Sequence, residues 1–156
     1  MGLRVLIVDD HPLVAEALTL AVQQASDAVE VDTAADLAAA CAKATGPRPY
    51  DLVLLDLALP DSEGLSGLRA LREQSPQSRI AIVTSRADPD SVRSAADFGA
   101  VGYMLKSTPF PQLTEDCREL MAGRTRFPVI KRETATWEDD AVRARLASLS
   151  AAQSRI

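Results

Sequence analysis

The stretch YDLVLLDLAL, residues 50–59, is an apolar run that carries a single carboxylate, Asp56, close to its end. A continuous run of leucine and valine is typical of a strand that is buried on both faces of a parallel sheet. A carboxylate that is removed from water needs a charged partner, a metal ion or a functional reason to be there. The remaining segments must therefore provide both a sheet that buries this strand and a partner for Asp56.

Short apolar runs alternate with amphipathic segments along the rest of the chain. We expect five strands at 3–8, 29–34, 51–55, 79–85 and 101–105, and five helices at 12–25, 36–44, 65–74, 88–100 and 109–122. Parallel strands need a helical crossover between them, so this alternation predicts an α/β fold with a doubly wound, five-stranded parallel sheet and helices on both faces. In such sheets the functional groups lie at the carboxyl ends of the strands, near the switch in strand order.

The composition is that of an ordinary globular protein, with 156 residues of which 47% are hydrophobic and 25% are charged. This length fits one domain with some residues left over. The net charge of −5 argues against a surface that coats nucleic acid. Two distant cysteines, Cys41 and Cys117, are expected to be buried reduced thiols, because no cluster of cysteine and histidine accompanies them. No stretch suits a signal peptide or a bilayer span, so we expect a cytoplasmic protein with no membrane association.

Several polar side chains directly follow or end the predicted strands. Asp9 and Asp10 follow the first strand, Asp56 ends the third, Thr84 ends the fourth and Lys106 follows the fifth. In the predicted sheet all five lie at the same edge, where three converging carboxylates repel one another unless a cation relieves them. Mg²⁺ accepts a few carboxylates together with waters and phosphate oxygens. A cation, an ammonium and a hydroxyl around one carboxylate suit a transferring phosphoryl group, which predicts Asp56 as a nucleophile.

Four segments resemble the receiver domain of two-component response regulators. They are VLIVDDHPLV (5–14), DLVLLDLALPDSEGL (51–65), IAIVTS (80–85) and FGAVGYMLKS (98–107). The resemblance covers residues 3–122 and implies a flavodoxin-like (receiver/CheY-like) fold. It also implies that Asp56 is the phospho-acceptor, which receives its phosphate from a histidine of a sensor histidine kinase.

The same resemblance implies a Mg²⁺ site. Asp10 and Asp56 match direct ligands, Asp9 matches an acid that acts through water, and the Ala58 carbonyl contributes as well. Such a chain catalyses its own phosphorylation and dephosphorylation and is not otherwise an enzyme.

Three further positions match residues that read out phosphorylation in the family. Thr84 matches the switch hydroxyl, Tyr103 matches the aromatic residue that turns inward on activation, and Lys106 matches the lysine that pairs with phosphate. For Tyr103 an ordinary half-buried strand aromatic is the alternative.

The style of these motifs resembles the NarL/LuxR-type subfamily, which joins a receiver to a helix-turn-helix domain. We therefore expect a receiver domain at 1–122, a linker at 123–148, and the start of a truncated DNA-binding domain at 149–156 (LSAAQSRI). A helix is expected at 136–149, mostly within the linker. The implied partners are a kinase, a second copy of the chain in a homodimer, and DNA through the largely absent domain.

Other charged residues near these motifs have simpler interpretations. His11, the only histidine, is expected to face solvent at the start of the first helix and to point away from the strand ends. Asp61 and Glu63 are expected to be solvated loop charges.

Two other functions compete with the signalling switch. A Mg²⁺-dependent phosphohydrolase also uses an aspartyl nucleophile at a strand end, but such enzymes usually carry a second aspartate two residues later, where this chain has Ala58. A pseudo-receiver that acts by protein contact alone is the other alternative, and the complete set of acceptor residues argues against it.

Overall fold

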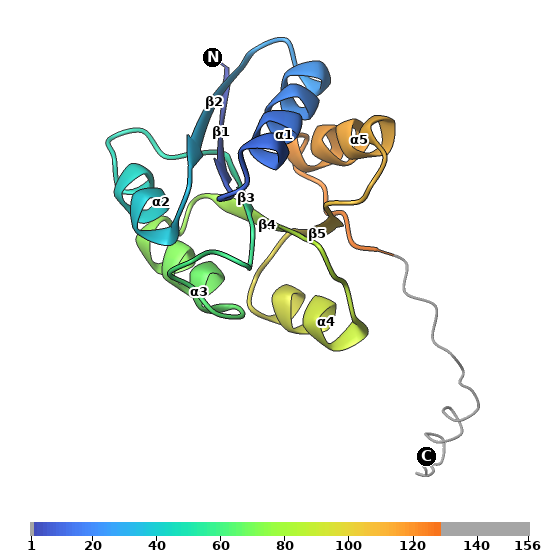
Figure 1. Cartoon of the computed structure of the whole chain (residues 1–156). Helices are drawn as coiled ribbons and strands as arrows, with labels where there is room; N and C mark the ends of the chain where they lie inside the picture. Colours follow the sequence, from blue (N-terminus) through green and yellow to red (C-terminus); the bar gives the residue numbers. More distant parts are fainter. Residues whose placement is uncertain (1, 129–156) are drawn as a thin grey trace, which may run out of the picture.

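The computed structural model describes residues 2–128 as one parallel sheet with helices on both faces (Figure 1). The strands are β1 (Leu3–Val8), β2 (Val29–Ala34), β3 (Leu52–Leu55), β4 (Arg79–Thr84) and β5 (Gly102–Leu105), and the helices are α1 (Pro12–Ala25), α2 (Leu37–Ala44), α3 (Ser66–Gln74), α4 (Pro89–Asp97) and α5 (Phe110–Met121). The strand order is β2-β1-β3-β4-β5, with every pairing parallel. The predicted fold class is thereby confirmed.

The strand that opened the sequence analysis, β3, lies at the centre of the sheet and divides its side chains between two hydrophobic cores. Leu52 and Leu54 pack with α1 and α5 on one face, while Val53 and Leu55 pack with α2, α3 and α4 on the other. Successive side chains of a strand point to opposite faces, so a strand covered on both sides has no position for a polar residue. This explains the unbroken apolar run.

Helix α4 shows how local signals set the bounds of an element. The side chain of Asp88 accepts a hydrogen bond from the Ser91 amide at 2.9 Å and caps the first turn. The helix ends at Asp97, and Gly99 follows with φ +97°, a conformation that glycine adopts without strain. The predicted segment 88–100 therefore includes the cap and the closing glycine as well as the helix.

The chain continues to bond to the sheet after α5. The Arg126 amide donates to the Val101 carbonyl at 3.1 Å, and the Arg126 carbonyl accepts from the Tyr103 amide at 2.8 Å. We call residues 124–128 the edge segment, because they run parallel to β5 at the outer edge of the sheet. At Gly102 a Cβ would lie 3.0 Å from the Arg126 carbonyl oxygen, so this close approach favours glycine.

Two of the expected segments, the tail helix at 136–149 and the start of a DNA-binding domain at 149–156, lie outside the described residues. Within residues 2–128 no helix has both the length and the apolar character that crossing a membrane requires.

Candidate functional site

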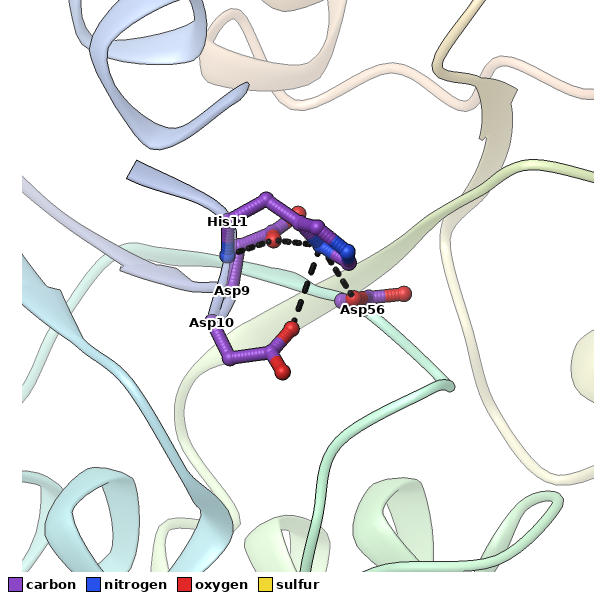
Figure 2. Close-up of side chains that lie close together, drawn as sticks. All are labelled: Asp9, Asp10, His11 and Asp56. Carbon is purple, nitrogen blue, oxygen red and sulfur yellow. Dashed lines mark hydrogen bonds and ion pairs between the residues drawn. The ribbon is translucent and has the colours of Figure 1, made fainter. Parts of the chain in front are cut away.

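Three carboxylates meet at the carboxyl ends of β1 and β3, the two strands between which the strand order reverses. Figure 2 shows Asp9 and Asp10 after β1, Asp56 after β3, and the ring of His11 among them. One ligand atom from each of these four residues lies within 4.8 Å of the others. Open α/β sheets bind their ligands in this crevice, so the predicted convergence of the acids is found where the fold favours a site.

Asp9 and Asp56 are buried because the backbone hydrogen bonds of the sheet continue through them. The Asp9 amide donates to the Ala34 carbonyl at 3.0 Å, and the Asp56 amide donates to the Val8 carbonyl at 2.9 Å. Each side chain exposes 1% of its surface, whereas the side chain of Asp10 exposes 35%. Two neighbouring buried carboxylates repel one another, so the site requires positive charge.

Lys106 supplies part of that charge from the end of β5. Its Nζ lies 3.0 Å from Asp56 Oδ2 and 3.1 Å from Asp9 Oδ2, and its backbone amide donates to the Thr84 carbonyl at 2.7 Å. Burial lowers the pKa of Lys106, but the attraction of the Asp56 and Asp9 carboxylates outweighs burial and leaves the pKa above its ordinary value. The ammonium therefore stays charged at neutral pH, as the sequence predicted for a lysine beside three acids.

The site retains unused capacity to accept a cation. Asp9 Oδ2 is buried and receives no hydrogen bond within the described residues, because Lys106 Nζ is at ion-pair distance but not in hydrogen-bond geometry. Asp56 Oδ1 is held by the Ala58 amide at 3.1 Å, which fixes the orientation of that carboxylate. Clustered carboxylate oxygens that are open to solvent at Asp10 fit a hard divalent ion that keeps part of its water shell, as Mg²⁺ does.

His11 does not point away from the strand ends, and the expectation that it does was wrong. Its Nδ1 lies 2.9 Å from Asp9 Oδ1, 3.1 Å from Asp10 Oδ1 and 3.3 Å from Lys106 Nζ, although the side chain as a whole is 57% exposed. The Asp9 carboxylate also accepts from the His11 backbone amide at 2.8 Å, and this turn directs the ring toward the acids. The only available sequence signal was the position of His11 directly after the acidic pair.

Thr84 lies at the end of β4 and Tyr103 lies within β5, as the sequence predicted. Thr84 is buried and pairs with Leu105 in the sheet, which brings the carboxyl ends of β4 and β5 together. Tyr103 is 3% exposed, and its hydroxyl donates to the Arg86 carbonyl at 3.1 Å. Burial raises the pKa of Tyr103, so it remains a neutral hydrogen-bond donor.

Asp61 is an exposed loop charge, as the sequence analysis expected, but it also caps a helix, which the sequence analysis did not predict. Its two carboxylate oxygens accept from the Leu37 amide at 2.8 Å and the Ala38 amide at 3.0 Å, in the first turn of α2. These bonds lower the pKa of Asp61 below its ordinary value. Sequence patterns did not reveal the contact because the donors lie more than twenty positions away in the chain.

Comparison with known proteins places this arrangement in a family. The sequence profile described as "Response regulator receiver domain" matches residues 5–118. A "Glycerol metabolism activator" from Pseudomonas putida is 35% identical over 135 residues, which are 85% of this chain and 61% of the relative. The "Response regulator protein VraR" of Staphylococcus aureus is 31% identical over 127 residues, which are 81% of this chain and 60% of that protein.

Solved structures agree with these relatives. A two-component response regulator of the LuxR family from Aurantimonas sp. SI85-9A1 superimposes with a TM-score of 0.70 and 31% identity, and the match covers 81% of this chain and 89% of that one. This chain spans about three fifths of the length of the curated relatives it matches.

Proposed function

This chain belongs to the response regulator receiver domain family of two-component systems, and on that premise we propose that Asp56 accepts a phosphoryl group from a phosphohistidine of a sensor kinase. The observation that carries the proposal is the buried Asp56 carboxylate, held by Lys106 at 3.0 Å in a crevice with Asp9 and Asp10. We place this activity in the cytoplasm and expect no general hydrolytic turnover.

In the transfer step an Asp56 carboxylate oxygen forms a bond to phosphorus while the phosphorus–nitrogen bond of the donor histidine breaks. The electron pair of that bond stays with the leaving imidazole, and Asp56 becomes an acyl phosphate. Lys106 lies within bonding distance of Asp56 and stabilises charge on the phosphoryl oxygens. A Mg²⁺ ion bound by Asp9, Asp10, Asp56 and the Ala58 carbonyl would neutralise further charge on these oxygens.

Phosphorylation would then change the surface on which Thr84 and Tyr103 lie. The Thr84 hydroxyl would bond the new phosphoryl group, and the accompanying movement of the backbone would alter the contact between Tyr103 and Arg86. Only an interaction that differs between two conformations can shift their populations. We propose that this shift controls homodimerisation and a DNA-binding output domain, and the likeness to a LuxR-family DNA-binding response regulator supports the second of these.

The direct test is the mass of the protein after exposure to acetyl phosphate and Mg²⁺. We expect the wild type to gain one phosphoryl group, the Asp56→Asn variant to gain none, and the Asp97→Asn variant, which changes an exposed aspartate of α4, to behave as the wild type. A wild type that gains no phosphoryl group while it binds Mg²⁺ would support the alternative of a pseudo-receiver.

Turnover separates the switch from a phosphohydrolase. A receiver takes up about one equivalent of phosphate, because its substrate is its own side chain and not a diffusing ester. Release of many equivalents from ordinary phosphate esters, lost on Asp56→Asn, would identify a hydrolase instead.

A further inference from the structure

The imidazole of His11 lies inside the acidic cluster, where one ring nitrogen faces both the acids and an ammonium group. Its Nδ1 lies beside carboxylate oxygens of Asp9 and Asp10, which require a donor, and also beside the Lys106 ammonium, which requires an acceptor. One ring nitrogen cannot be both, since the neutral ring carries a proton on only one of its two nitrogens. A cation between Nδ1 and the acids would be bound by the lone pair of Nδ1 and by the carboxylate oxygens, while Lys106 would keep its hydrogen bond to Asp56.

The spacing of the atoms agrees with a shared cation. Around an octahedral ion with bonds of about 2.1 Å, adjacent ligand atoms lie about 3.0 Å apart and opposite ones about 4.2 Å apart. From His11 Nδ1 the distances are 2.9 Å to Asp9 Oδ1, 3.1 Å to Asp10 Oδ1 and 3.9 Å to Asp56 Oδ2. The first two values match adjacent positions, and the third approaches an opposite one.

We propose that His11 supplies a nitrogen ligand to the divalent cation of this site through Nδ1. This inference rests on the proposed function, which implies that a cation binds, and it concerns which cation the site prefers. Mg²⁺ prefers oxygen ligands, whereas Mn²⁺, Co²⁺ and Ni²⁺ also bind imidazole well. With His11 as a ligand, the site discriminates in favour of these transition metals more strongly than three carboxylates alone would.

The buried Asp9 Oδ2 has one charged partner, the Lys106 ammonium at 3.1 Å, and can accept a further ligand. This oxygen belongs to a side chain with 1% exposure and receives no hydrogen bond from any described residue. The exposed side of His11 leaves an open path from solvent to the cluster. The ring thus completes the open side of a site whose other walls are the ends of β1 and β3.

The test compares Mg²⁺ and Co²⁺ binding to the metal-free chain by calorimetry, in the wild type and in the His11→Ala variant. We expect the variant to raise the Kd for Co²⁺ by about tenfold or more, since even groups that only orient metal ligands contribute 10–100-fold. The Kd for Mg²⁺ should change by less than about threefold. The His11 side chain makes no capping hydrogen bond to α1, so the variant should fold, which circular dichroism would verify.

The Leu13→Ala variant is the matched control, because Leu13 is the most exposed large hydrophobic residue of the same helix turn. Its ratio of Co²⁺ to Mg²⁺ affinity should equal that of the wild type. A second measurement needs no variant: pulsed electron paramagnetic resonance of Mn²⁺ bound to the wild type should show coupling to a ¹⁴N nucleus.

Three results would overturn the nitrogen ligand. They are an unchanged affinity ratio in His11→Ala, tighter binding of both metals when the ring is removed, and the absence of nitrogen coupling. A wild type that binds Mg²⁺ and Co²⁺ as expected but gains no phosphoryl group from acetyl phosphate would instead overturn the phospho-acceptor proposal and leave the role of His11 intact.

Discussion

At the scale of single residues, the site depends on one ammonium group facing two buried acids. Among residues 2–128, Lys106 is the only lysine or arginine that pairs with Asp9 or Asp56. Removal of one partner from a buried ion pair leaves an uncompensated charge and costs roughly 3–5 kcal/mol. The openness of this site at Asp10 reduces that penalty, because water can solvate the acids in part.

We therefore expect Lys106→Met to lower the free energy of unfolding by about 2 kcal/mol, as measured by urea denaturation at neutral pH without divalent ions. Saturating Mg²⁺ should recover more stability in the variant than in the wild type, because a ligand stabilises the state that binds it. Lys43→Met is the control, since Lys43 is exposed and its ammonium bonds only the Thr33 carbonyl. Equal losses in the two variants would contradict this account.

The two cysteines differ in their surroundings. Cys117 is buried in the core beneath α1 and α5, whereas Cys41 is half-buried beside the other core, so both thiols are free and lie on opposite faces of the sheet. Burial, with a smaller contribution from Asp116, raises the pKa of Cys117 to about 12. The raised pKa of Cys117 stabilises the folded state at pH values below about 8.5, the pKa of an unfolded cysteine. This stabilisation is lost as the pH rises toward 12.

Alkylation with iodoacetamide at pH 8, followed by peptide mass spectrometry, tests this difference. We expect Cys41 to react in the folded protein and Cys117 to react only as urea unfolds it, since the thiolate is the reactive form. The free energy of unfolding should also fall between pH 9 and 12. Native-state modification of Cys117 at the rate of Cys41 would show that its burial is not maintained.

At the scale of elements, the start of α2 is held by two aspartates. Asp36 accepts a hydrogen bond from the Ala39 amide at 2.8 Å, and Asp61, from the loop after β3, accepts two more from the first turn. The four amides at a helix start need acceptors, and here the loop after β3 supplies acceptors for two of them. The loop that follows Asp56 and Ala58 is thereby fixed to a helix on its own side of the sheet.

Asp61→Ala should lower the thermal unfolding midpoint at pH 7, because two amides of α2 lose their acceptor. The pKa of Asp61 is lowered by folding, so its stabilising effect is present above about pH 4 and is lost as the pH falls through the folded pKa. The difference from the wild type should therefore shrink in acid. Glu63→Ala, a change in the same loop at an exposed residue, should leave the midpoint unchanged at both pH values.

The edge segment can approach β5 closely because Gly102 has no Cβ. A Cβ at this position would lie 2.9 Å from the Leu120 side chain and 3.0 Å from the Arg126 carbonyl. The guanidinium of Arg126 also pairs with Asp116 of α5 at 2.7 Å. Backbone hydrogen bonds to β5 and the ion pair of the Arg126 side chain therefore both hold the segment in place.

We expect Gly102→Ala to destabilise the protein by about 1–3 kcal/mol, the usual cost of overpacking, and to speed hydrogen exchange at the Tyr103 and Arg126 amides. Gly46→Ala is the control, because its Cβ would meet only one atom, the Lys43 carbonyl oxygen at 3.3 Å. Protected amides at both positions in Gly102→Ala would mean that the segment adapts without leaving the sheet.

Local patterns were sufficient for the elements but not for the contacts between them. The β3 run and the capped α4 were predictable because burial on two faces and a helix cap both determine the types of residues that are adjacent in the sequence. The rotation of His11 into the acids, the reach of Asp61 to α2 and the pairing of Arg126 with β5 depend on partners distant in the chain. Residues 124–128 carry no strand alternation that could have predicted that pairing.

At the scale of the whole molecule, Tyr103 connects the site to the outer edge of the sheet. Its hydroxyl donates to Arg86 in the loop after β4, and its amide donates to Arg126 of the edge segment. Any movement of the β4 loop on the proposed phosphorylation of Asp56 would therefore act on a residue that also contacts the start of the predicted linker.

Hydrogen exchange with Mg²⁺ and beryllofluoride, a mimic of the phosphoryl group, tests this connection. We expect altered exchange at the Tyr103, Lys106 and Arg126 amides and no change along β2, which lies at the opposite edge of the sheet. The Asp56→Asn variant should show no response. Changes confined to Lys106 would indicate that the signal does not reach the edge segment.

The pairing of Arg126 with β5 also affects how this receiver can be isolated. A version truncated directly after α5 would expose the outer peptide groups of β5, and an uncovered strand edge is a template for intermolecular pairing and aggregation. A version that ends directly after α5 would therefore aggregate more readily than one that ends a few residues later.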